Sequence, residues 1–456
     1  MQVDTAPEHA ADTMLRHLFG EDLSPEELLE LEDGLFLFEC MAEYTLAVGN
    51  TVTAIRKEEW AFKVRETERL VGLGRISQAL HRLTSLGLAS DTPAVRAALL
   101  AKFPAIPPGR EVVGRHPAAP PGHIEMDVFL RALRSFAVGV GPGPDGLRAE
   151  FLKSMIGDSE DDPVLLYMRD FAQLLGDGLA PTYLRPWLAG GQLIGVGKHD
   201  SLGRPIALIA DARPIVMGLT WRKLVFKCTL QMDKATLRER LLPDQMAVGV
   251  VCGAEAMLHA TREWLASNRH QPDCVLLQTD ISNAFNTLLP AQFLQDAATY
   301  APASARFAEY YYGTPSRLVY QRESVECARG QQGCPLMAPL FCLSRCRLIE
   351  EARRNNPRPS PGFSPAFADD SFSGGSVDEV WEQFRQELQL ADAYGLHVDP
   401  RKCTLYLLAG ERFRGDVSRF QSLGVRKVTG ADVLMLKTPI SENADFLQSF
   451  QEEKQG

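Results

Sequence analysis

The sequence predicts a mixed α/β fold, in which short apolar strands are connected by longer amphipathic helices. Residues 275–279 form an apolar run that is typical of a buried strand, and this run ends at Asp280. Residues 366–372 place apolar and aromatic side chains on both sides of Asp369 and Asp370, as in a tight hairpin with the two acids at its tip. Together these segments predict a sheet that carries carboxylates at one edge.

The elements around these two segments follow from the same patterns. A helix is expected over residues 377–393 and a strand over residues 404–408. Upstream, apolar runs at residues 192–198 and 206–215 predict a second hairpin, with a helix that starts near Trp221 behind it. The alternation of strands and helices thus extends over the middle and the C-terminal part of the chain.

The three acidic residues predict a metal site. Adjacent carboxylates such as Asp369 and Asp370 repel each other unless a cation neutralises them, and Mg2+ is a hard cation that prefers oxygen ligands. Asp280 would complete a site for two ions, with Ile281 beside it as a further candidate ligand. Taken singly, the Asp pair is more typical of a solvated turn and Asp280 of a helix N-cap, so the prediction depends on all three acids meeting.

Four segments of the chain form an ordered set of motifs. They are Asp280 with residues 284–285, then residues 330–336, residues 367–370 and residues 395–402. This order resembles that of the palm motifs of reverse transcriptases, in particular those of non-LTR retrotransposons. Four motifs in one order are far more specific than any one of them alone. The resemblance covers about residues 130–440, which is roughly two thirds of the chain.

This resemblance implies a right-hand polymerase fold, with fingers placed before a palm of ferredoxin-like topology. The implied activity is RNA-directed DNA polymerisation, in which dNTPs are added to the 3′ end of a DNA or RNA primer on an RNA template. Asp280, Asp369 and Asp370 would hold two Mg2+ ions, with Mn2+ as the alternative ion. An RNA-dependent RNA polymerase is an alternative that uses the same acids.

Further residues receive roles from the resemblance. Lys198 and Arg213 lie on the expected fingers hairpin, where they would contact the triphosphate of the incoming nucleotide. Gln332 would lie near the new base pair, and Gly333 would permit a close approach of the backbone. Lys402 would donate a proton to the departing pyrophosphate. The alternative for each of the three cations is an ordinary solvated surface charge.

Phe285 follows Asp280 in the first motif and is the candidate for selecting the sugar. A bulky ring at this place would collide with the 2′-hydroxyl of a ribonucleotide, so it favours deoxynucleotides. Otherwise Phe285 is an ordinary core residue. An RNA-dependent RNA polymerase would carry a small or polar residue here.

Composition predicts how the chain is divided. Residues 104–122 are rich in Pro and Gly and should form a linker at the main domain boundary. The polymerase-like domain itself is expected at about residues 180–440. The expected parts are a helical N-terminal extension (1–103), the linker (104–122), fingers (123–240), a palm (241–440) and a C-terminal stub (441–456).

The formal net charge of −10 is unusual for a protein that binds phosphates. Residues 1–70 hold 16 Asp and Glu against 6 Lys and Arg, a balance of −10, so the rest of the chain is close to neutral. The 9 scattered cysteines lack a CxxC pair, so a zinc finger or a disulfide framework is not expected. Neither a signal peptide nor a membrane-spanning run is recognised, which predicts an intracellular soluble protein. The nucleus is indicated by the resemblance alone.

Three features depart from the family pattern. Residues 337–339 lack the Ser that usually precedes the second Pro of the motif, and Lys437 stands where a Gly is usual in the strand pair that grips the primer. The chain ends at Gly456, so the helical thumb is expected to be truncated or absent. These departures keep a second hypothesis open, namely a truncated retroelement remnant that does not polymerise and acts at most as a nucleic-acid-binding module.

Overall fold

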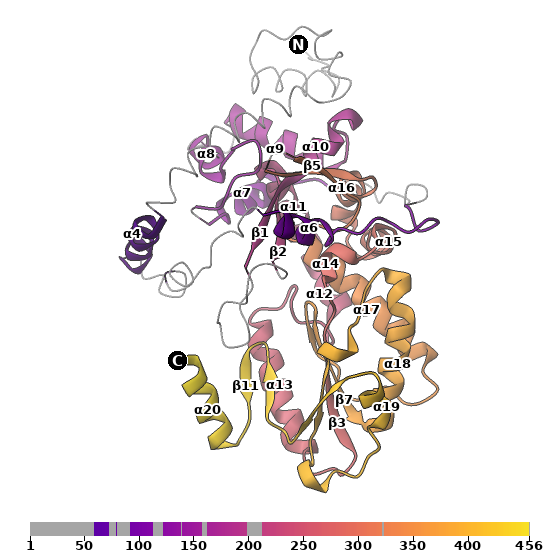
Figure 1. The fold of residues 1–456 in the computed structure, drawn as a ribbon. Coiled ribbons are helices and arrows are strands. Elements are labelled where there is room, and N and C mark those ends of the chain that lie inside the picture. Colours follow the sequence, from indigo (N-terminus) through magenta and orange to yellow (C-terminus); the bar gives the residue numbers. More distant parts are fainter. Residues whose placement is uncertain are drawn as a thin grey trace.

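The computed structural model shows two larger sheets, one above the other in Figure 1, with helices around them. This arrangement confirms the mixed α/β class. The described part of the 456-residue chain comprises residues 59–72, 79, 92–112, 122–137, 139–156, 162–197, 212–321 and 323–455.

Helix ends coincide with residues of known capping behaviour. Helix α18 begins at a capping box formed by Ser376 and Glu379, and it ends at Gly395 in the left-handed conformation. Proline occupies the first turn of several other helices, where its missing N–H is not needed. In chain order the helices are α4 (Glu59–Gly72), α6 (Pro93–Leu100), α7 (Met126–Arg134), α8 (Ala149–Ser154), α9 (Pro163–Gly176), η1 (Thr182–Leu184), α10 (Arg185–Leu188), α11 (Thr220–Met232), α12 (Lys234–Leu241), α13 (Gly253–Asn268), α14 (Ala284–Thr287), α15 (Pro290–Tyr300), α16 (Pro302–Tyr312), α17 (Met337–Asn355), α18 (Val377–Tyr394), η2 (Pro400–Lys402), η3 (Gly410–Arg412), α19 (Ser418–Ser422) and α20 (Ala444–Gln455).

The strands form these two sheets and a separate hairpin. The upper sheet has the order β2-β1-β4-β5, the lower sheet has the order β6-β7-β3-β8-β9, and β10 pairs with β11. In chain order the strands are β1 (Gly191–Val196), β2 (Arg213–Met217), β3 (Cys274–Thr279), β4 (Ser316–Tyr320), β5 (Glu323–Cys327), β6 (Ala366–Phe367), β7 (Asp370–Ser376), β8 (Thr404–Leu407), β9 (Arg426–Thr429), β10 (Val433–Met435) and β11 (Thr438–Ile440).

Four strands of the lower sheet are connected in two different ways. The segment between β3 and β6 contains helices α14 to α17 and also β4 and β5 of the upper sheet, whereas α18 lies between β7 and β8, and β6 and β7 form a hairpin. Strand β3 lies between β7 and β8 and is antiparallel to both. With β4 and β5 set aside, these four strands and their helices run in the order β-α-β-β-α-β, and the expected ferredoxin-like palm stays a prediction.

Strand β3 is buried on both faces because its alternate side chains enter two different cores. Val275 and Leu277 belong to the large cluster that includes side chains of α17 and α18. Cys274 and Leu276 pack with residues of α13 and of the β10–β11 hairpin. The end of β3 is therefore fixed from both sides of the sheet.

The upper sheet is built around β1, which is antiparallel to β2 and parallel to β4. Helix α6 packs on this sheet through Val95 and Leu99, each 1% exposed, next to Leu193 of β1. Strand β2 continues to Met217, beyond the expected end of the second strand, because its pairing with β1 extends to Gln192.

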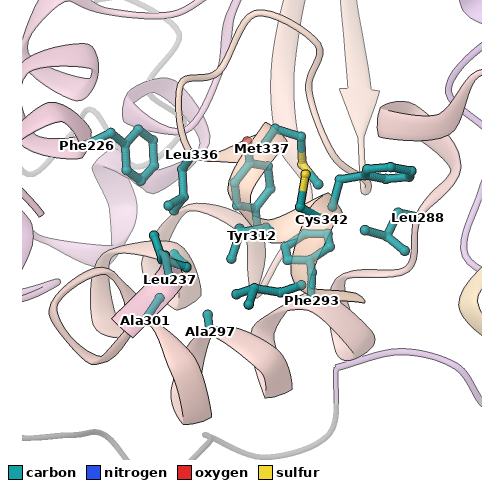
Figure 2. Close-up of a cluster of buried hydrophobic side chains, with 14 of the residues drawn as sticks. Phe226, Leu237, Leu288, Phe293, Ala297, Ala301, Tyr312, Leu336, Met337 and Cys342 are labelled. Atoms are coloured by element: carbon teal, nitrogen blue, oxygen red, sulfur yellow. The ribbon is translucent and has the colours of Figure 1, made fainter. Parts of the chain in front are cut away.

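A large apolar cluster joins the helices that lie between the two sheets. Figure 2 shows part of it, with Phe226, Leu237, Phe293 and Tyr312 close to Leu336 at the start of α17. These side chains come from helices that are distant in the sequence. This shared core packs the helices between the two sheets against one another.

Residues 104–105 contact the folded part of the chain through the side chain of Arg329. Arg329 is only 5% exposed, and it donates from Nε to the Pro104 carbonyl at 2.8 Å and from Nη2 to the Ala105 carbonyl at 2.7 Å. Its Nη1 donates to the Thr287 carbonyl at the end of α14. The first part of the expected linker is thus held in place, and the division of the chain at residues 104–122 stays a prediction.

The two ends of the chain differ in how much of them is described. The expected extension at residues 1–103 lies mostly outside the described residues, apart from α4, α6 and short flanking stretches. The expected stub at residues 441–456 contains helix α20. Among the helices described, none combines the length and the apolar character needed to cross a membrane.

Candidate functional site

Asp280 directly follows β3, at the edge of the lower sheet where β7 begins. Because β3 and β7 are antiparallel, with Thr279 opposite Ser371, Asp280 lies beside Asp370 across the two strands. Asp280 is exposed to solvent. The structure therefore brings the acid after β3 and the acidic hairpin to one place.

A two-residue turn, Ala368 and Asp369, joins β6 to β7, and Phe367 is paired with Asp370. Ala368 has a φ of 55°, in the left-handed region. The buried Gln245 bonds both backbone groups of Ala368. Its Nε2 donates to the carbonyl at 3.1 Å, and its Oε1 accepts from the N–H at 2.8 Å. The turn that carries the acids is thus held by a side chain from another segment.

The carboxyls of the hairpin lie in a field of like charge. Both side chains reach solvent, yet surrounding protein atoms displace part of the water around them. This burial raises the pKa of Asp370 to about 6, and the charges of Asp369 and Asp280 act in the same direction. Burial also raises the pKa of Asp369, with a further contribution from Asp280. Lys437 opposes the shift in the pKa of Asp370, and Arg213 opposes the shift in that of Asp369.

The donor chemistry of these acids suits a hard divalent cation, because carboxylates that repel one another are stabilised when a cation lies between them. As the side chains stand, no three His, Cys, Asp or Glu residues within the described part of the chain form a group tight enough to hold a metal ion. Ile281, the further candidate ligand, is buried, and its backbone pairs with Val398. The donor atoms are of the type that a divalent cation prefers, and the metal site itself stays a prediction.

Lys402 lies beside the segment that follows Asp280. Its Nζ donates a hydrogen bond to the Ser282 hydroxyl at 3.0 Å. The Ser282 N–H in turn donates to the His397 carbonyl at 2.9 Å. Residues 397–402 are therefore fastened to the end of β3. The ammonium is exposed, so its position is compatible with a proton donor and equally with a surface cation.

The turn before α17 packs against β2. The Val216 N–H donates to the Gln332 carbonyl at 2.7 Å, and the Gln332 N–H donates to Asn286 Oδ1 at 3.1 Å. Gly333 has a φ of 107°, and a Cβ at this position would lie 2.6 Å from the Val216 oxygen. Glycine thus permits a close backbone approach here. The role of the Gln332 side chain stays a prediction.

Arg213 belongs to the upper sheet, and its charge affects one acid of the lower sheet, Asp369. Arg213 is the first residue of β2, and its side chain is exposed. Its positive charge opposes the rise in the pKa of Asp369. Lys198, its expected partner at the triphosphate, lies outside the described residues.

Phe285 lies in the short helix α14, after the turn that follows β3. Its ring is half-buried and packs edge-on against Phe341 of α17, with ring centres 5.2 Å apart. A Cβ on Gly330 would lie 2.2 Å from the Phe285 carbonyl oxygen, so the two backbones are in close contact. One side of the ring belongs to the core and the rest is accessible, and the gate stays a prediction.

One polar cluster behind the hairpin was missed by sequence reasoning. Arg345 of α17 is buried and donates from Nη2 to Glu387 of α18 at 2.5 Å and to the Ser371 hydroxyl at 3.3 Å. Gln383 also donates to Glu387, at 2.8 Å. Ser371 directly follows Asp370, so this ion pair supports the strand that carries the acid. Arg and Glu are normally exposed, and their occurrence in a helix gives no sign of burial.

Comparisons with known proteins leave the family open. No family model and no curated protein matches the chain. Among solved structures, the chain is similar to a telomerase from Candida albicans in complex with a fragment of telomeric RNA, at 11% identity and a TM-score of 0.36, over 49% of this chain and 43% of that one. It is also similar to a telomerase from Candida tropicalis, at 11% identity and a TM-score of 0.34, over 48% of this chain and 50% of that one. The match spans half of those chains or less, and likeness at this level defines neither a family nor an activity.

Proposed function

We propose that this protein is a nucleotidyltransferase of the reverse transcriptase type, which adds dNTPs to a primer 3′ end on an RNA template. One observation carries the proposal: Asp280 follows β3, and Asp369 and Asp370 stand on the adjacent hairpin of the same sheet. Phosphoryl transfer involves little covalent chemistry by the protein itself. It requires fixed ligands for cations and positive charge around the phosphates. The three aspartates would supply the ligands, and Arg213 would supply positive charge.

Each residue has a role that suits its position. Asp280, Asp369 and Asp370 would hold the divalent ions, Mg2+ or alternatively Mn2+. When bound, two such ions lower the pKa of the attacking hydroxyl and neutralise charge on the leaving oxygen. Arg213 would hold the triphosphate, and Lys402, which is fastened to the segment after β3, would protonate the leaving pyrophosphate.

The choice of sugar would depend on Phe285. Its ring packs edge-on against Phe341, a contact that would support it as a steric gate. Phe285→Ala should therefore raise the use of ribonucleotides relative to deoxynucleotides by about 10- to 100-fold, measured in parallel extension reactions. An unchanged ratio would contradict the gate, and a wild-type preference for ribonucleotides would favour an RNA-dependent RNA polymerase.

Primer extension by the purified full chain, with an RNA template, dNTPs and Mg2+, tests the proposal. Asp369→Asn and Asp280→Asn keep the size of the side chain and remove its charge, so each should reduce extension by at least about 100-fold. Asp170→Asn is the matched control. Asp170 is an exposed acid on α9, paired with Arg169, and its loss should leave extension unchanged.

Two outcomes would count against this function. Equal extension by the wild-type protein and by Asp369→Asn would mean that this acid does not take part in the reaction. A wild-type protein that binds RNA but extends no primer would instead support the retroelement remnant, which acts as a nucleic-acid-binding module.

A further inference from the structure

Gln245 and the turn that carries Asp369 are in contact although 123 residues separate Gln245 from Ala368. Gln245 is 1% exposed. Its amide satisfies the N–H and the C=O of the same residue, Ala368, at 2.8 and 3.1 Å. The Oε1 atom also accepts from the Ala247 N–H at 3.1 Å, which fixes the orientation of the amide.

The backbone of Ala368 needs such support. A two-residue hairpin with a left-handed φ at its first central residue favours glycine, because a Cβ is strained there. Ala368 has this φ and carries a Cβ. A strained conformation of this kind persists only where neighbouring groups enforce it. By bonding both polar groups of Ala368, Gln245 fixes the peptide planes on either side and hence the direction in which Asp369 leaves the turn.

The segment that presents Gln245 is itself anchored. The Met246 N–H donates to the Ala366 carbonyl at 2.9 Å, and the Ala366 N–H donates to the Asp244 carbonyl at 2.7 Å. The Asp244 carboxylate forms an ion pair with Arg353 of α17 at 2.5 Å. The amide therefore reaches the turn from a frame that is tied both to β6 and to a long helix.

We propose that Gln245 is a positioning residue that holds Ala368 in the left-handed conformation and thereby sets the orientation of the Asp369 carboxylate. An amide suits this role because it offers a donor and an acceptor at once. The consequence for catalysis rests on the proposed function, whereas the effect on Ala368 does not.

Two variants separate this role from general stability. Gln245→Met removes both hydrogen bonds at nearly unchanged size, and the further change Ala368→Gly removes the strain that the bonds offset. Gln245→Met should lower kcat for primer extension by about 10- to 100-fold and change KM for dNTP much less, because a misplaced carboxylate impairs the reaction more than nucleotide binding. Adding Ala368→Gly should recover most of the lost kcat.

A direct readout of the turn needs no activity. In protein labelled with 13C and 15N at alanine, the backbone chemical shifts of Ala368 report its φ, and the missing signal in Ala368→Gly assigns the resonance. The wild-type shifts should indicate the left-handed region. Gln245→Met should move them away from it.

Gln173→Met is the matched control. Gln173 also bonds two backbone groups of another segment, accepting from the Ile124 N–H at 2.6 Å and donating to the Gly122 carbonyl at 2.9 Å. Its replacement removes the same kinds of bond between α9 and the segment before α7, and it should leave kcat and the Ala368 shifts unchanged.

Left-handed shifts of Ala368 that persist in Gln245→Met would overturn the proposal at any level of activity. An unchanged kcat of Gln245→Met in an active protein would overturn it as well. If the wild-type protein extends no primer, the proposed function fails, and the Ala368 shifts alone decide whether Gln245 holds the turn.

Discussion

The two sheets of this molecule support their charged residues in different ways. Behind the lower sheet, Arg345 and Glu387 form an ion pair whose side chains are 2% and 4% exposed. On the upper sheet, Arg96 of α6 pairs with Glu323 of β5, and these side chains are 34% and 53% exposed. Strand β3 is buried along nearly its whole length, whereas β5 is mostly exposed. The lower sheet is the more tightly constrained of the two.

This difference suggests a division of tasks. Carboxylates that share a cation need a rigid support, and packed strands position side chains more accurately than loops do. A cation that meets a charged ligand arriving from solvent needs exposure instead, and Arg213 has it at the start of β2. Substitutions of buried charged residues behind the lower sheet should therefore lower the free energy of unfolding strongly. Substitutions of exposed charged residues on the upper sheet should lower it only slightly.

The largest loss of stability is expected when one partner of the buried ion pair is removed. Arg345→Met leaves the Glu387 charge buried and uncompensated, so the free energy of unfolding should fall by about 3–5 kcal/mol. A second change, Glu387→Gln, removes that charge and keeps an acceptor for Gln383, so the double variant should recover most of the loss. Urea unfolding followed by circular dichroism measures both values. A loss below about 1 kcal/mol would mean that the two sheets do not differ in this respect.

A smaller loss is expected from one added methyl group on β7. A Cβ on Gly374 would lie 2.4 Å from the Trp264 ring, which is stacked on Phe363 with ring centres 4.8 Å apart. Gly374→Ala should lower the free energy of unfolding by about 1–3 kcal/mol and alter tryptophan fluorescence. Gly362→Ala is the control, because no described atom would lie within 4 Å of its Cβ, and its effect should stay within about 0.5 kcal/mol. Similar losses for the two variants would show that the packing around β7 accommodates an added methyl group next to Trp264.

The exposed ion pair of the upper sheet should matter less. Arg96→Met removes the bond to Glu323, and the free energy of unfolding should fall by less than about 1 kcal/mol, because water screens the pair. The difference from wild type should shrink further in 1 M salt, where the Debye length is about 3 Å. Denaturant titrations at low and high salt measure this. A loss as large as that of Arg345→Met would remove the contrast between the sheets.

The smallest effect concerns a half-buried acid outside both sheets, in the turn that precedes α8. Burial raises the pKa of Asp145 to about 6, against the hydrogen bond from the Leu147 N–H and the charge of Lys223. The folded protein thus holds this proton more tightly than the unfolded chain does. The resulting stability is present below the ordinary pKa of 3.8 and is lost as the pH rises through about 6.

Asp145→Asn keeps the acceptor for Leu147 and removes the charge. It should raise the free energy of unfolding by up to about 1 kcal/mol at neutral pH and leave it unchanged at acidic pH. Thermal unfolding at pH values on either side of the two pKa values checks this. The same gain at both pH values would show that charge burial is not the cause.

The elements that carry the acids could be predicted because their signals are local. The apolar run at residues 275–279 ends at a carboxylate, and the acidic pair between aromatic residues indicates a hairpin. The observed β3 and the β6–β7 hairpin correspond to these patterns. Helix α18 begins at Val377, as expected, and ends one residue beyond the predicted Ala393.

Contacts between distant segments carry no such signal. Nothing in the local pattern around Gln245 indicates that its amide bonds Ala368, and nothing in α17 or α18 marks Arg345 and Glu387 as a buried pair. Helix α6 has an apolar face, but periodicity does not say that this face packs on the upper sheet. The mutual arrangement of the acids likewise depends on strand register, which residue types alone do not determine.

The guanidinium of Arg329 sets a limit on how far this protein can be shortened. Two of its N–H groups are covered by the carbonyls of Pro104 and Ala105, which lie ahead of the expected fingers. A fragment that starts at residue 123 would leave these groups without their acceptors, and each unmade hydrogen bond costs about 1–3 kcal/mol. A stable recombinant fragment should therefore begin before Pro104, so that the expected linker is retained.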